Sequence, residues 1–214
     1  MAYPPLTQVS GEVFRPTREH IANRLAGPAP LAAPNDLHLV ARPDGARVTE
    51  AAVLVPIVDR PAGLQLMLTQ RTPHLDNHAG QISFPGGRVE EGDASREETA
   101  LRETEEEIGL PRSAVTLLGR LPIYDNLSGF RITPVVGWIE PPFVLKPDPF
   151  EVAAAFEAPL RHFLEITNYQ RREFHFRGRH RHYMAIPYEG RYIWGATAAM
   201  LYSFARMLAV ESEP

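Results

Sequence analysis

Three glutamates, Glu103, Glu106 and Glu107, have a spacing that places them on one face of a helix. At 100° per residue they fall within one arc of about 100°. Repulsion between Glu103 and Glu107, which are four residues apart, costs a free helix about 0.2–0.5 kcal/mol. Mg²⁺ binds through a few carboxylates and keeps water and phosphate as further ligands, so the cluster predicts a platform for Mg²⁺ or Mn²⁺. The alternative is a solvated acidic face, which is what most charge runs are.

The residues around this cluster set the ends of the expected helix. Asp93 and Ser95 are both good N-cap residues, and Ser95 with Glu98 makes a capping box. Gly109 is expected to end the helix at its C-terminus. The pattern therefore predicts a helix over about 95–108.

An apolar stripe at helical spacing predicts the core side of this helix. The stripe consists of Leu101, Thr104 and Ile108. The glutamates then lie at the edge of the buried face, neither deep nor fully exposed. Arg102 is the one clear countercharge, at a spacing that would pair it with Glu98 and Glu106. One arginine does not neutralise the cluster.

The loop before the helix favours a ligand site over a solvated face. Phe84-Pro85-Gly86-Gly87 follows a short apolar segment. Paired glycines let a backbone approach a metal or a phosphate closely, and the Gly87 carbonyl can turn toward the helix.

Together these residues resemble the Nudix box, the signature of hydrolases that cleave nucleoside diphosphates linked to another moiety. The matching pattern is Gly87, five residues, Asp93, and then residues 102–110. This sequence departs from the box in three places. Asp93 stands where the general pattern has Glu, eight residues rather than seven separate it from Arg102, and Thr104 occupies a usually aliphatic position.

The stretch upstream of the box is similar to the coenzyme A pyrophosphatase branch of that family, which carries the longer box. The similar residues are 66–71 and 78–87, and the resemblance covers about residues 50–208. Further matches are Ser128-Gly129, Thr133-Pro134-Val135-Val136-Gly137, Glu151-Val152, Pro159-Leu160 and Ile193-Trp194-Gly195-Ala196-Thr197-Ala198. The resemblance implies hydrolysis of coenzyme A or its thioesters to 3′,5′-ADP and 4′-phosphopantetheine or its acyl form.

The resemblance also implies roles for residues of the box. Glu103 and Glu107 would be the principal ligands of Mg²⁺ or Mn²⁺. Glu106 would be a further ligand and a member of the catalytic set, and the Gly87 carbonyl would add another ligand. Arg102, also counted in the catalytic set, would hold the carboxylates in place rather than touch the substrate. For Asp93, a cap of the helix is as good an interpretation as a catalytic part.

The resemblance also implies roles for four residues outside the box, each with a simpler alternative. Glu151 is the best match for the carboxylate base that a later loop often brings to the metals. The alternative is that Glu151 is simply an acidic residue of a surface loop. Arg71, at the end of a strand, would contact a phosphate. The alternative is that Arg71 is an exposed arginine at a strand end with no role in binding. His78 and Gln81 would shape the substrate loop, although a single histidine in a loop is more often a local hydrogen-bonding residue.

A basic segment later in the chain, residues 171–183, alternates cations with aromatics. A β-hairpin with one solvent-exposed face is the favoured interpretation. The alternative is a surface that holds an extra phosphate and stacks an adenine.

Bulk properties fit one globular domain. The chain has 214 residues, a net charge of -4 and no cysteine. A general nucleic-acid binder would show a basic surface, so no nucleic-acid partner is expected. The resemblance implies a small nucleotide substrate as the partner, with a homodimer left open. The N-terminus lacks a basic region followed by an apolar stretch, and no apolar run approaches the roughly 18 residues of a membrane span, so a cytoplasmic protein is expected.

The chain divides into an arm, residues 1–45, and a hydrolase domain, residues 46–214. The arm would carry a helix over 17–25 and a proline-rich stretch. Strands are expected at 51–58, 64–70, 81–84, 115–122, 132–139, 172–177, 181–187 and 191–194, and a long apolar helix at 196–209. The fold class is α/β, and the resemblance implies a Nudix-type α/β/α sandwich with a mixed sheet.

Two rival functions stay open. The same machinery could act on ADP-ribose, a dinucleotide or an oxidised nucleotide. The chain could instead be a non-catalytic nucleotide-binding module, although such a module has no need to retain all three glutamates.

Overall fold

The computed structural model describes residues 16–27, 48–75, 78–126, 129–176 and 178–209. The helices are α1 (Arg18–Ala26), α2 (Arg96–Ile108), α3 (Leu160–Leu164) and α4 (Ala196–Ala209), with short 3₁₀ turns η2 (Arg112–Ala114) and η3 (Ile166–Asn168). The strands are β1 (Thr49–Arg60), β2 (Gly63–Arg71), β3 (Ile82–Ser83), β4 (Gly86–Arg88), β5 (Val115–Arg120), β6 (Tyr124–Asp125), β7 (Phe130–Ile139), β8 (Val152–Pro159), β9 (Gln170–Phe176), β10 (Arg179–Tyr188) and β11 (Arg191–Trp194). The predicted helices are confirmed to within about one residue at each end.

The main sheet is mixed, as predicted. Its strand order is β3-β2-β1-β7-β5, with β4 paired to β1, β6 to β7 and β8 to β2. β1 and β7 run parallel over a long register, from Thr49↔Phe130 to Val58↔Ile139. The other pairs of this sheet are antiparallel.

β8 is a long strand that the sequence pattern did not predict. Its run of alanines has weak β-propensity, so local preference gives no strand signal there. Pairing with β2, from Gln65↔Pro159 to Arg71↔Val152, supplies the order instead. β4 and β6, also not predicted, are only two or three residues long.

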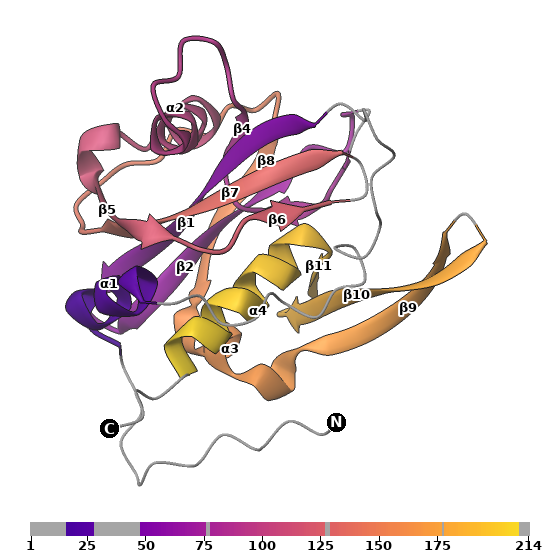
Figure 1. Ribbon diagram of the computed structural model, residues 1–214. Coiled ribbons are helices and arrows are strands. Elements are labelled where there is room, and N and C mark those ends of the chain that lie inside the picture. Colours follow the sequence, from indigo (N-terminus) through magenta and orange to yellow (C-terminus); the bar gives the residue numbers. More distant parts are fainter. Residues whose placement is uncertain (1–15, 28–47, 76–77, 127–128, 177, 210–214) are drawn as a thin grey trace, which may run out of the picture.

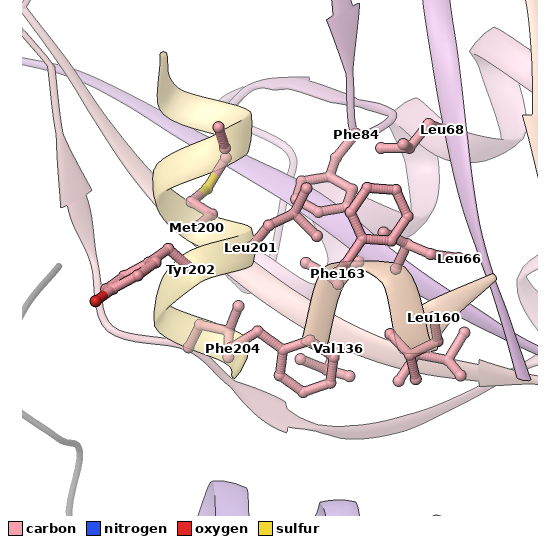
Figure 2. Close-up of a cluster of buried hydrophobic side chains, with 14 of the residues drawn as sticks. Leu66, Leu68, Phe84, Val136, Leu160, Phe163, Met200, Leu201, Tyr202 and Phe204 are labelled. Carbon is pink, nitrogen blue, oxygen red and sulfur yellow. The ribbon is translucent and has the colours of Figure 1, made fainter. Parts of the chain in front are cut away.

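Helices cover both faces of the main sheet, which gives the α/β/α layers (Figure 1). α2 packs on one face over an apolar cluster that includes Leu54, Met67 and Ile108. α3 and α4 pack on the other face, where Figure 2 shows Leu201 and Phe204 of α4 beside Phe163 of α3 and the sheet residues. None of the described helices is long and apolar enough to cross a membrane.

The described part of the predicted arm is α1, and its apolar side is buried. Ile21 is fully buried in the same cluster as α4. The Arg24 Nε donates to the Met207 carbonyl at 2.8 Å. The proline-rich stretch predicted after α1 lies outside the described residues.

The basic segment forms a hairpin in a second, three-stranded sheet ordered β11-β10-β9. β9 and β10 are antiparallel, with Phe174↔Arg181 and Glu173↔His182 among the paired residues. The hairpin extends away from α4 (Figure 1). The hairpin predicted for this segment is confirmed.

Candidate active site

α2 has the ends that its sequence predicts. The Ser95 Oγ accepts from the Glu98 N–H at 3.1 Å, and Gly109 ends the helix in the left-handed region at φ 67°. The Glu98 carboxylate pairs with Arg112. The predicted pairing of Glu98 with Arg102 is therefore wrong, because η2 brings a nearer arginine to this side of the helix.

The paired glycines bring β4 against the carboxylates of α2. The Gly86 N–H donates to the Glu107 Oε2 at 3.2 Å. A Cβ at Gly87 would overlap the Glu103 carboxylate, and a Cβ at Gly86 would overlap the β1 backbone. Gly86 also has a φ of +150°, which L side chains rarely adopt. Glycine is therefore required at both positions, because the neighbouring atoms leave no space for a Cβ.

The three glutamates differ strongly in depth. The exposed fraction of the side chain is 8 % for Glu107, 18 % for Glu103 and 59 % for Glu106. The prediction that all three lie at the edge of the buried face is wrong for Glu107, because β4 covers it.

Burial changes the proton affinity of the two deeper carboxylates. It raises the pKa of Glu107 to about 8, against the lowering effect of the Gly86 N–H and Arg71. Burial also raises the pKa of Glu103, against the lowering effect of Arg102. Both carboxylates therefore carry an electrostatic cost when ionised together.

Arg102 connects the glutamates to the loop before the helix. Its Nε and Nη2 donate to both Asp93 carboxylate oxygens at 2.9 and 3.0 Å. Its Nη1 lies 3.1 Å from both Glu103 Oε1 and Glu106 Oε2. These contacts are the geometry that a positioning role for Arg102 requires.

Asp93 is an anchor for Arg102. The Arg102 guanidinium, together with the Glu90 N–H at 2.9 Å, holds the pKa of the Asp93 carboxyl well below its usual range. The Thr99 hydroxyl also donates to it at 2.8 Å. The helix N-cap is Ser95, so the prediction that Asp93 caps the helix is wrong, and the Asp93 side chain is only 4 % exposed.

Arg71 ends β2 beside the most buried glutamate. Its Nη1 lies 3.9 Å from the Glu107 Oε1. Its Nε is buried and has no hydrogen-bond partner among the described residues. A buried donor without a partner is costly, so this atom is suited to an acceptor on a ligand.

The loop after Leu145 brings Glu151 to the same place. The Asp148 N–H donates to the Glu107 carbonyl at 2.9 Å, and the Thr72 N–H donates to the Glu151 carbonyl at 3.0 Å. The charge of Glu151 contributes to the raised pKa of both Glu103 and Glu107. The structure therefore places the Glu151 carboxylate within electrostatic reach of both.

His78 and Gln81 form a local turn beside Arg71. The His78 Nδ1 lies 2.9 Å from the Gln81 Oε1, and His78 has a left-handed φ of 59°. The Gln81 carbonyl accepts from the Arg71 N–H at 2.9 Å. The pair lies next to Arg71 along the sheet edge, and its role in shaping a substrate loop stays a prediction.

Sequence reasoning missed two residues that position the site. Thr72 and Asp148 hold the Glu151 loop through backbone and side-chain hydrogen bonds. Thr72 directly follows Arg71, and Asp148 precedes a proline, a common place for a turn-forming aspartate. That turn signal was present, but its partner on α2 was not readable from the chain.

The carboxylates are suited to a hard cation, although they do not yet converge on one. Within the described ranges no three metal-ligating side chains form a ready-made group. Arg102 contacts Glu103 and Glu106, and Gly86 contacts Glu107. The set is nevertheless made of oxygen donors whose mutual repulsion a divalent cation would relieve, and Gly87 leaves room for close approach.

The sequence that forms this site matches a known protein family. The family model described as NUDIX domain matches residues 48–160, which include every candidate residue from Arg71 to Glu151. The protein named "Uncharacterized Nudix hydrolase NudL" of Escherichia coli strain K12 is 43% identical over 162 residues, which are 76% of this chain and 84% of that one.

Solved structures with a similar chain path are more distant in sequence. A Caenorhabditis elegans Ap4A hydrolase binary complex is 19% identical with a TM-score of 0.45, covering 51% of this chain and 80% of that one. The NUDIX domain of Shewanella oneidensis NrtR complexed with ADP ribose is 20% identical with a TM-score of 0.43, covering 60% and 84%.

Proposed function

Because the chain belongs to the Nudix family of hydrolases, we propose that the diphosphate bond it cleaves is that of coenzyme A or its thioesters. The products are 3′,5′-ADP and 4′-phosphopantetheine or its acyl form. The observation that supports the proposal is that Glu151 lies within electrostatic reach of Glu103 and Glu107, beside Arg71, whose buried Nε has no partner among the described residues.

Glu103 and Glu107 are the proposed principal ligands of Mg²⁺ or Mn²⁺, with Glu106 and the Gly87 carbonyl as further ligands. A cation held by these residues would offset phosphate charge and lower the pKa of an attacking water. The raised pKa of Glu107 means that cation binding releases its proton near neutral pH. Arg102 holds Glu103 and Glu106 in place from the side of Asp93.

Arg71 and Glu151 contact the reacting groups in this proposal. The Arg71 Nε donates to a phosphate oxygen, which gives this buried atom a partner. Glu151 takes a proton from a water molecule as the oxygen of that water attacks phosphorus. The bridging P–O bond breaks, and its oxygen leaves with the other phosphate.

The choice of coenzyme A rests on the residues that flank Arg71, 66–71 and 78–87, and on the longer box. ADP-ribose or another nucleoside diphosphate derivative is the second candidate for the same carboxylates. A non-catalytic nucleotide-binding module is less favoured, because binding alone does not need Glu151 beside Glu103 and Glu107.

The test is hydrolysis of coenzyme A and ADP-ribose by the purified full chain with Mg²⁺ or Mn²⁺. We expect a higher kcat/KM for coenzyme A, products identified by mass in ¹⁸O-water, and no turnover in excess chelator. Glu103→Gln should lower the rate by at least about 10²–10³. Glu105→Gln, on the same helix but paired with Arg112, is the control and should keep full activity.

The outcomes separate the two levels of the proposal. A higher kcat/KM for ADP-ribose refutes the coenzyme A assignment and leaves hydrolysis intact. Full wild-type turnover in chelator refutes the metal-dependent mechanism.

A further inference from the structure

One large apolar side chain of the Glu151 loop lies on the surface. Phe150 is 64% exposed. Among the described residues it belongs to neither of the two apolar clusters. A single exposed apolar residue is ordinary on a protein surface, so exposure alone assigns no role. The inference rests on the hydrogen bonds of the Phe150 backbone and on the residues that lie beside it.

The backbone of Phe150 is held on both sides. Its N–H donates to the Asp148 Oδ1 at 2.9 Å. Its carbonyl accepts from the Thr72 hydroxyl at 2.8 Å. These two polar contacts therefore hold the backbone of Phe150 in place within the loop.

A second ring lies beside it. The centroids of His74 and Phe150 are 5.0 Å apart, with an angle of 59° between the ring planes. His74 is itself exposed. The two rings come from segments far apart in the chain and together form a small, wet aromatic surface.

This ring pair adjoins the proposed chemistry on both sides. Phe150 directly precedes Glu151, whose charge acts on Glu103 and Glu107. His74 is three residues after Arg71, whose Nη1 is 3.9 Å from Glu107. Each ring is therefore close in the chain to a residue that the proposed function assigns to the substrate or to the attacking water.

We propose that Phe150, flanked by His74, is the base-binding surface of the substrate, and that a purine base stacks on its exposed ring. The inference rests on the proposed function and adds the position of the nucleoside half. A flat, largely exposed ring on a held backbone suits a flat base, since stacking needs area and little ordering. The His74 ring lies beside Phe150, and most of the Phe150 side chain remains exposed to a ligand.

The test measures the two halves of coenzyme A separately. Calorimetric Kd values are obtained for AMP, 3′,5′-ADP and 4′-phosphopantetheine with wild type, Phe150→Leu and Phe150→Trp in Mg²⁺. Loss of stacking predicts that Phe150→Leu raises the Kd of AMP and 3′,5′-ADP about 5- to 30-fold. It should leave the Kd of 4′-phosphopantetheine unchanged, and Phe150→Trp should keep wild-type binding of both nucleotides.

Two control variants separate position from general hydrophobicity. Val144→Ala changes an 84% exposed side chain on the same connecting segment. Trp194→Leu changes a 40% exposed aromatic of β11, in the other sheet. Neither should change nucleotide binding, and thermal melts of all variants should match wild type.

Several results would overturn the inference. These are unchanged nucleotide binding in Phe150→Leu, an effect on 4′-phosphopantetheine alone, an equal effect on both halves, a larger effect from Trp194→Leu, and no binding of AMP by wild type. Because AMP binding needs no hydrolysis, failure to cleave coenzyme A refutes the proposed function without deciding the base surface.

Discussion

Replacing Glu107 by glutamine removes a charge from a side chain that is only 8 % exposed. Glutamine keeps an oxygen that can accept from the Gly86 N–H. Burial raises the pKa of Glu107 from its ordinary 4.5 to about 8. At about 1.4 kcal/mol per pKa unit, the ionised carboxylate is disfavoured in the folded protein by about 5 kcal/mol.

The pH dependence follows from where the proton is held. Between pH 4.5 and about 8 the folded protein keeps a proton that the unfolded chain has released. Wild-type stability therefore falls as pH rises through this window and levels off above it. Glutamine does not titrate, so the free energy of unfolding of Glu107→Gln should exceed that of wild type by a margin that grows with pH toward about 5 kcal/mol.

Urea unfolding in chelator at about pH 5 and about pH 8.5 measures this margin, with equal m-values as the check that both proteins unfold alike. Glu106→Gln is the matched control, because its side chain is 59 % exposed, and its effect should be small at both pH values. An equal margin for Glu107→Gln at both pH values would show that the Glu107 carboxylate does not carry this cost.

Three other perturbations test the remaining contacts. Mg²⁺ should stabilise wild type more at about pH 8.5 than at about pH 6, because binding displaces the Glu107 proton; equal shifts in Tm at matched ionic strength would contradict this. Arg102→Lys should lower the free energy of unfolding by about 3 kcal/mol, because the Arg102 side chain is only 14 % exposed and lysine cannot make the bidentate contact with the Asp93 carboxylate. A change below about 1 kcal/mol in urea unfolding would show that this bidentate contact is unimportant for stability. Gly87→Ala should cost about 1–3 kcal/mol in thermal melts and lower kcat, since its Cβ meets the Glu103 carboxylate; Gly92→Ala, where the Cβ meets open space, is the control, and equal melts for the two variants would refute the close approach.

Sequence reasoning succeeded where local signals are strong. Ser95 and Gly109 set the ends of α2 because capping is a property of a few neighbouring residues. The paired glycines predicted that the backbone lies close to another group. That this group is the Glu103 carboxylate is visible only in the structure.

It failed where distant segments decide the environment. Helical periodicity places Glu107 at an edge, but β4 folds over it and buries it. Of the two partners predicted for Arg102, Glu106 is confirmed, whereas Glu98 is wrong because it pairs with Arg112. The contact of Arg102 with Asp93 was not predicted. The alanine-rich β8 is a strand because β2 pairs with it, and no local pattern reports that pairing.

The hydrogen bond from Thr72 to Phe150 joins residues separated by 78 positions in the chain. Contacts of such separation form late in folding, since closing a long loop costs entropy before any contact forms. α2 can form its carboxylate face locally, whereas Glu151 reaches it only after β2 and β8 have paired. With Glu151 as the proposed base, enzymatic activity reports completed chain topology, and during refolding its return should lag behind the recovery of helical signal.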